Sequence, residues 1–175
     1  MFIDREAWIW VLPCLAMAAF SGMLDSYRIA VFFLALALLL AAFFRDPQRV
    51  CPDTDKLILS PADGKIVDIA ADESFALAPG QRFQRISIFL NIFDVHINRT
   101  PVTGQLSAAA YHPGKFHMAH LPKASLENEQ SQLLFTTPQQ QLVGMKQIAG
   151  LVARRVVTRI KPGDTLKAGD RIGLI

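Results

Sequence analysis

Cysteine is scarce in this sequence. Of its 175 residues, only Cys14 and Cys51 are cysteines. Cys14 lies inside an apolar run and Cys51 in a linker punctuated by proline and aspartate. The two residues therefore offer neither a disulfide framework nor the spacing of a metal site.

Charge is missing from two stretches near the start. Residues 7–24 and 29–44 contain no Asp, Glu, Lys or Arg, and only the short sequence DSYR separates them. Each run is close to the roughly 17 to 25 residues that cross the hydrocarbon of a bilayer, the second being slightly short. The pattern predicts a hydrophobic helical hairpin over residues 1–47 that anchors the chain in a membrane, either by spanning it or by dipping into it.

Two other interpretations of these runs are weaker. A signal peptide begins with net positive charge, whereas Asp4 and Glu6 remove it here, and a second apolar run follows at once. A buried helix pair of a soluble protein would keep a polar stripe, which neither run has.

Basic residues indicate the orientation of the hairpin. Arg45, Arg49 and Lys56 follow the second run, whereas the turn contains only Arg28. Since positive residues favour the cytoplasmic side, we expect the rest of the chain at the cytoplasmic face of the cell membrane. Its excess of basic residues suits an anionic membrane surface. These residues are too few and too scattered to indicate binding to nucleic acid.

After residue 47 the pattern changes to short apolar segments separated by turn residues, which is typical of strands. No segment there has a long helical periodicity, so residues 48–175 are expected to form a mostly β sandwich or barrel. The expected strands lie in KLILSPADGKIVDIA, QRISIFLNIF, TGQLSAAAYH, QQLVGMKQIAG, ARRVVTRI and RIGLI.

Two stretches of this domain echo one another. SPADGKIVDIA at 60–70 and IKPGDTLKAGDRIGLI at 160–175 both have strands joined by turns, and together they resemble the lipoyl and biotinyl carrier folds. The expected fold class is thus mostly β, a lipoyl/biotinyl-like β-sandwich hybrid preceded by the helical hairpin. A carrier would also display a lysine at a hairpin tip, and the nearest candidate, Lys146, lies in an apolar strand. Fold alone does not give function.

Asp63 and His96 are the first candidates for chemistry. Asp63 precedes Gly64, a pair that commonly forms a hairpin turn, and a carboxylate held at such a turn can also orient an imidazole. An isolated histidine beside an apolar strand is more often structural, but His96 has Asp94, Asn98 and Arg99 nearby.

Strand alternation would place Asp94, His96 and Asn98 on one face, where the imidazole would act as a general acid or base. Arg99 would pair with a phosphate or carboxylate, or else be solvated.

The other three histidines lie in one stretch of the chain. His112, His117 and His120 fall in YHPGKFHMAHLPK, without any known zinc pattern. We therefore expect no metal there. Apolar residues interleave with the basic ones over 116–121, which favours a loop lying over the site or on the membrane surface.

Seven ordered motifs resemble one family. FFRDP, SPADGKIVDI, FDVHINRTPVTGQL, YHPGKF, KASLENE, IAGLVARRVV and KPGDTLKAGDRIGLI occur in this order and cover nearly the whole chain from residue 43 onward. Together they resemble the short, membrane-anchored class of phosphatidylserine decarboxylase. The sequence departs from that pattern at Gln130, where the family has an arginine.

The resemblance implies a proenzyme that cuts itself at a Gly-Ser bond. The products are a β chain and a short α chain, whose new N-terminus is a covalent pyruvoyl group. This chain resembles the β chain, with the cleavage point expected just after it. None of its ten glycines is followed by serine, so the pyruvoyl cofactor would belong to the α chain.

The resemblance also implies roles for individual residues. His96 would take the serine proton during self-cleavage, with Asp63 orienting it, and would later protonate the substrate carbon. The lipid phosphate would be bound by Arg99, His112 and Lys115.

The function expected is conversion of phosphatidylserine to phosphatidylethanolamine and carbon dioxide. The expected partners are the α chain and the phospholipid membrane, and further copies of the chain remain an open option. The alternative is a non-catalytic, membrane-tethered, lipoyl-like adaptor or carrier domain, and a metal hydrolase that uses the three histidines is a third and weaker hypothesis.

Overall fold

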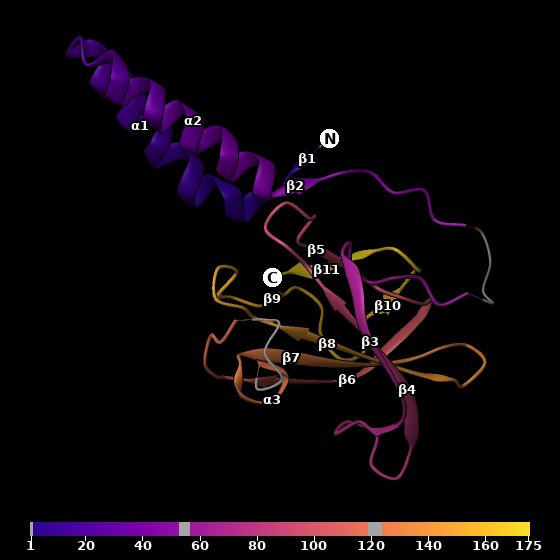
Figure 1. Ribbon diagram of the computed structural model, residues 1–175. Helices are drawn as coiled ribbons and strands as arrows, with labels where there is room; N and C mark the ends of the chain where they lie inside the picture. The colour runs from indigo at the N-terminus through magenta and orange to yellow at the C-terminus, as the bar shows by residue number, and fades with distance from the viewer. Residues whose placement is uncertain (1, 53–56, 119–123) are drawn as a thin grey trace. The chain divides into compact units, whose positions relative to one another are not determined.

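The computed structural model describes residues 2–52, 57–118 and 124–175 (Figure 1). The chain divides into two compact units. One comprises Met1–Gln48 with Phe93–His96, and the other comprises Arg49–Ile92 with Ile97–Ile175.

The first unit is a pair of antiparallel helices, α1 (Trp8–Met23) and α2 (Tyr27–Phe43), with the short helix η1 (Arg5–Ala7) before α1. The Asp4 side chain caps η1 by accepting a hydrogen bond from the Glu6 amide over 3.0 Å. At the base of the pair, strand β1 (Phe2–Ile3) pairs with β2 (Arg45–Asp46). The predicted helical pair is therefore present.

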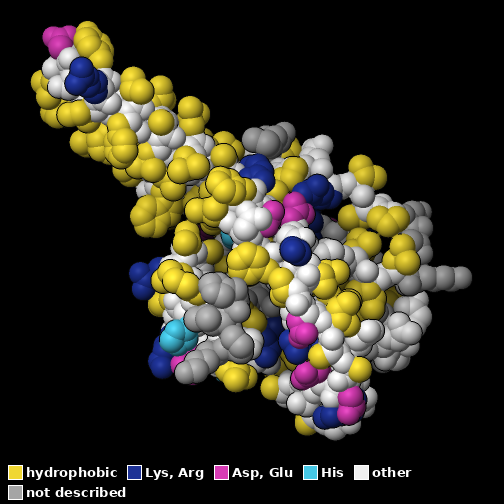
Figure 2. Space-filling model, viewed as in Figure 1, with side chains coloured by type: hydrophobic (Ala, Val, Ile, Leu, Met, Phe, Trp, Pro, Cys, Tyr) yellow, Lys and Arg dark blue, Asp and Glu magenta, His cyan; other side chains and the backbone are white. Residues whose placement is uncertain are grey.

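Small side chains line the contact between these helices, while large apolar ones point outward. Ala7, Val11 and Ala37 are buried between α1 and α2. The outer surface carries exposed tryptophan, leucine and phenylalanine side chains (Figure 2). Residues Arg5–Met23 are long and apolar enough to cross a membrane, and Tyr27–Phe43 forms a shorter apolar helix of 17 residues.

The second unit is built almost entirely of strands. Its largest sheet has the order β10-β6-β7-β8 and is antiparallel throughout. A three-stranded sheet has the order β5-β11-β9, and β3 pairs with β4 as a two-stranded ribbon. The bounds are β3 Lys65–Ser74, β4 Arg82–Phe89, β5 Ile97–Arg99, β6 Gly104–His112, β7 Gln130–Thr136, β8 Leu142–Ile148, β9 Val157–Thr158, β10 Thr165–Leu166 and β11 Arg171–Leu174.

The core of this unit lies between the two larger sheets. Leu106, Leu133, Phe135 and Met145 come from the four-stranded sheet and pack with Ile172 of β11. On the opposite face of the four-stranded sheet, the Phe75 ring lies against Gly144, where an added Cβ would lie 3.0 Å from it. The mostly β prediction is confirmed.

The structure differs from the predicted strands in two places. Residues 57–60 are not a strand, so the SPADG turn is entered from an irregular segment rather than from a hairpin partner. Strand β7 was not predicted, although it lies at the centre of the largest sheet. Its first three residues are polar yet buried, which hides the strand from a search for apolar alternation.

Candidate active site

Strand β5 is the centre of the candidate site, because it follows His96 directly in the sequence. Its neighbour is β11, whose Leu174 pairs with Ile97 and, on its other side, with Val157 of β9. The approach between β11 and β9 is close, since a Cβ added at Gly173 would lie 1.9 Å from the Val157 carbonyl oxygen. Only glycine therefore fits at this position.

His96 is buried and its ring is fixed on two sides. The ring stacks on Phe43 with centroids 4.2 Å apart, and Nδ1 lies 3.0 Å from the Asp94 carbonyl oxygen. Because a carbonyl can only accept, Nδ1 carries the hydrogen, which leaves Nε2 as the basic nitrogen in the neutral ring. Burial lowers the pKa of His96 below that of free imidazole, an effect that the Asp94 carbonyl partly offsets. Burial thus favours the neutral form of the imidazole, in which Nε2 is the acceptor.

Asp94, His96 and Asn98 do not share a strand face, contrary to the alternation argument. Strand β4 ends at Phe89, residues 92–94 form a turn, and β5 begins only at Ile97. The alternation rule applies within one strand, so it does not extend back to Asp94.

Asn98 instead belongs to a buried polar network. Its Oδ1 accepts a hydrogen bond from Gln147 Nε2 over 2.9 Å, and both residues are only 1% exposed. Thr158 Oγ1 donates to Gln147 Oε1 over 3.0 Å and also hydrogen-bonds to Ser131 Oγ at 2.9 Å. The network links β5 and β9 to β7 and β8, and so holds β5 in place.

Asp63 lies in the turn that precedes β3 and forms an ion pair with Arg49. The turn is tied to β5, since the Arg99 amide donates to the Pro61 carbonyl oxygen over 2.9 Å. Gly64 has φ of 138°, and an added Cβ would lie 2.4 Å from the Phe89 carbonyl oxygen. Asp63 and His96 belong to different units, and their contact stays a prediction.

The three predicted phosphate ligands have different surroundings. Arg99 is half-buried and its Nη1 donates to the Gly169 carbonyl oxygen over 3.0 Å. His112 is exposed at the end of β6, where its backbone pairs with Gln130. Lys115 is exposed just beyond that strand end. His112 and Lys115 are thus neighbours along one exposed segment.

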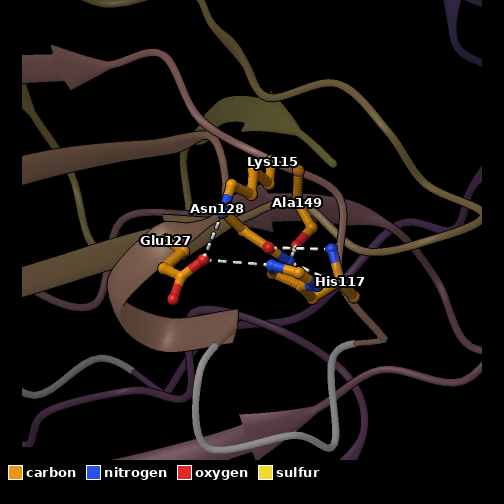
Figure 3. Close-up of polar contacts among 5 residues, drawn as sticks. All are labelled: Lys115, His117, Glu127, Asn128 and Ala149. Atoms are coloured by element: carbon orange, nitrogen blue, oxygen red, sulfur yellow. Dashed lines mark hydrogen bonds and ion pairs between the residues drawn. The ribbon is translucent and has the colours of Figure 1, made fainter.

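Lys115 takes part in a small charged cluster (Figure 3). Its Nζ lies 2.9 Å from Glu127 Oε2, and His117 Nε2 lies 3.2 Å from the same oxygen. The hydrogen bond from Lys115, followed by that from His117, lowers the pKa of Glu127. One carboxylate oxygen thus engages both Lys115 and His117.

Asn128 fixes the backbone beneath this cluster, a role that the sequence analysis missed. Its Oδ1 accepts from the His117 amide over 2.8 Å, and its Nδ2 donates to the carbonyl oxygens of His117 and Ala149 over 2.9 and 2.8 Å (Figure 3). Gly114 lies so close that a Cβ would be 2.4 Å from the Glu127 carbonyl oxygen. Gly114 belongs to the motif YHPGKF and Asn128 to KASLENE, but no local pattern in either motif names the partners of Asn128.

Two further side chains near this segment, those of Gln130 and Arg154, have contacts of their own. Gln130, which stands where the resembled family has arginine, is buried and its Oε1 accepts a hydrogen bond from Gln132 over 3.2 Å. Arg154, which the sequence analysis did not single out, lies with its guanidinium carbon 4.7 Å from the centre of the Phe116 ring.

His120 lies outside the described residues, so the three-histidine hypothesis is not tested as a set. Within residues 2–52, 57–118 and 124–175, no group of three His, Cys, Asp or Glu side chains is arranged to hold a metal ion. His117 is engaged by Glu127 and its backbone by Asn128.

A family model and the similar proteins all indicate the same family. The family model described as phosphatidylserine decarboxylase matches residues 36–175. The chain is 49% identical to a protein of Erythrobacter litoralis over 82% of this chain and 61% of the relative. It is 41% identical to one of Magnetococcus marinus over 99% of this chain and 79% of the relative. Both relatives are named phosphatidylserine decarboxylase proenzyme, and the chain spans less than two thirds of the first.

Proposed function

The chain belongs to the phosphatidylserine decarboxylase family, a family of carboxy-lyases, and we propose that it forms the larger part of an enzyme that converts phosphatidylserine to phosphatidylethanolamine and carbon dioxide. The observation that carries the proposal is the family match over residues 36–175, which includes His96 and the Asp63 turn. The buried, neutral imidazole of His96 supports it chemically.

We propose further that the enzyme arises from a precursor that cleaves itself at a Gly-Ser bond outside residues 1–175. The relatives are named proenzymes and are longer than the matched region. No glycine of this chain precedes a serine. Leu174 of β11 pairs with Ile97, so a segment that continued β11 would start at the N-terminal end of β5.

His96 is the proposed proton carrier in both reactions. During self-cleavage its Nε2 accepts the hydroxyl proton of the attacking serine, and Asp63 orients the ring and stabilises the cation. A pyruvoyl group, once formed, supplies an electrophilic carbonyl and an electron sink for loss of carbon dioxide. In that second reaction His96 returns a proton to the substrate carbon.

Arg99, His112 and Lys115 are proposed to bind the lipid phosphate. Lys115 and His112 are exposed on neighbouring positions, and Glu127 restrains the lysine chain. Charge-assisted hydrogen bonds from such groups suit a phosphate.

We propose that residues 1–47 anchor the enzyme and that residues 48–175 form the catalytic domain at the cytoplasmic face of the membrane. The apolar surface of α1 and α2 supports the anchor, and the basic residues after α2 support the orientation. The echoing stretches at 60–70 and 160–175 favour a lipoyl-like hybrid arrangement of the strands.

The test is self-cleavage of matched variants expressed from the complete reading frame. We expect His96→Ala and Asp63→Asn to slow cleavage about 10²-fold or more. The control Asp72→Asn, in an exposed ion pair with Arg82, should cleave normally. An adaptor or carrier domain would be indifferent to all three changes.

Chelation tests the metal-hydrolase hypothesis. A strong chelator is expected to leave decarboxylation unchanged. Loss of activity on chelation, and its return with added metal, would favour a metal hydrolase that uses His112, His117 and His120.

A further inference from the structure

The ribbon formed by β3 and β4 exposes one apolar face. Ile66 lies opposite Ile88, and Ile69 lies opposite Ile86. Residues opposite one another share a face, and so do Ile86 and Ile88, which are two apart in β4. We call these four side chains the isoleucine face. Ile66, Ile69 and Ile86 are 55%, 58% and 54% exposed, and Figure 2 shows hydrophobic side chains at the surface over this region.

The opposite face of the ribbon is already occupied. Phe83 meets Phe75 edge to face with ring centres 5.9 Å apart, and the Phe75 ring lies against Gly144 of β8. Arg85 on this side pairs with Asp68 and Glu73. A two-layer sheet protein usually presents its polar face outward, so an outward isoleucine face indicates a surface that is covered in the complete protein.

The edges of the ribbon indicate that the isoleucine face is covered by polypeptide rather than by lipid. Among the described residues, β3 and β4 pair only with one another, so each strand has an unpaired outer edge. The unpaired backbone N–H and C=O groups of an open edge can hydrogen-bond to an added strand. In hydrocarbon they would have no partner, so open strand edges do not occur there. A two-stranded ribbon alone is also marginally stable.

We propose that the isoleucine face, with the adjoining edges of the ribbon, is the docking surface for a strand of the precursor segment outside residues 1–175. This inference rests on the proposed function, in which that segment becomes the second chain. The length of the relatives favours this occupant, because the chain spans 61% and 79% of two relatives that are named proenzymes. Those relatives contain polypeptide beyond the matched region that could supply the strand.

Photo-cross-linking in the protein expressed from its complete reading frame tests this docking. Ile69→p-benzoylphenylalanine places the probe on the isoleucine face. Gln139→p-benzoylphenylalanine, at the exposed tip between β7 and β8, is the control. After irradiation, peptide mapping by mass spectrometry should join position 69 to a peptide from outside residues 1–175, at several times the yield from position 139.

The outcomes separate docking from cleavage. A cross-link to the outside segment in a protein that is never cut supports docking and contradicts self-cleavage. A cut protein whose position 69 links only to a second copy of residues 1–175, only to lipid, or to nothing overturns the docking proposal and leaves the decarboxylase proposal standing.

Discussion

Gln147 of β8 donates a hydrogen bond to Asn98 of β5 over 2.9 Å, and each side chain is 1% exposed. The two residues are 49 positions apart in the sequence and join the four-stranded sheet to the three-stranded one. Since Asn98 lies two residues after His96, this buried contact fixes the strand that leads away from the proposed base.

Removing one partner of that contact should destabilise the protein. Asn98→Ala leaves the Gln147 amide buried without its acceptor, so we expect a loss of about 1 to 3 kcal/mol in the free energy of unfolding. Chemical denaturation of the detergent-solubilised protein measures it. Replacing both residues, Asn98→Leu with Gln147→Leu, should cost less than the sum of the single changes, and Gln139→Ala at an exposed turn should cost nothing. Equal stability of Asn98→Ala and the unmodified protein would contradict the network.

Gly173→Ala tests the placement of β11. The new Cβ would meet the Val157 carbonyl oxygen at 1.9 Å, so β9 and β11 must separate. We expect a destabilisation of about 1 to 3 kcal/mol together with slower self-cleavage of the precursor. Gly80→Ala, where a Cβ meets nothing within 4 Å, tests whether a glycine change alone has this effect, although its φ of 83° adds some strain there. If the two variants were cleaved at the same rate, β11 would not be positioning the cleavage site.

The pH dependence follows from the lowered pKa of His96. Burial favours the neutral ring, so the base form persists to lower pH than in free imidazole, whose pKa is about 6.5. The cleavage rate should therefore fall, as pH is lowered, with an apparent pKa below about 6.5. Phe43→Ala uncovers the ring, and the acid limb should then move upward toward that value. An acid limb that stays in place in this variant would contradict the assignment.

The same shift has a consequence for stability. Because the folded pKa is depressed, the unfolded chain binds the proton first as pH falls below about 6.5. The stabilisation from neutral His96 is complete above that pH and is lost as pH falls toward the folded pKa. His96→Gln should remove this part of the pH dependence, which thermal melts between pH 7 and pH 5 would measure.

Glu127→Gln tests the role of Lys115. Loss of the carboxylate releases Lys115 and His117 from their shared partner, which leaves the lysine freer to bind phosphate. We expect KM for phosphatidylserine to fall by up to about fivefold, with kcat unchanged, because an exposed ion pair contributes little. Lys115→Gln should raise KM. An increase of KM in Glu127→Gln would mean that Glu127 positions the lysine rather than competing for it.

Much of the fold could be predicted from local signals. Two long uncharged runs, 7–24 and 29–44, predicted the helices found at Trp8–Met23 and Tyr27–Phe43 within a few residues. Strands rich in isoleucine and valine, such as β4 and β8, were predicted in the same way. The resemblance carried by seven ordered motifs predicted the family, and this is confirmed.

What could not be predicted depends on strand register. The polar start of β7 is buried although its side chains are polar: Ser131 pairs with Thr158 of β9, and Gln132 donates to Gln130 of the same strand. No local pattern reveals the partner in β9. For the same reason the partner of Asn98 could not be named from the sequence. The alternation argument for Asp94 was wrong because a turn interrupts the chain before β5.

The most direct test of the decarboxylase proposal is intact mass of the protein expressed from its complete reading frame, before and after treatment with cyanoborohydride and a simple amine. The account predicts a second, smaller chain that gains the mass of one reductive amination, because its N-terminus carries a carbonyl. A single chain of unchanged mass would contradict both self-cleavage and the pyruvoyl chemistry, provided that a cooperative thermal melt shows the protein to be folded.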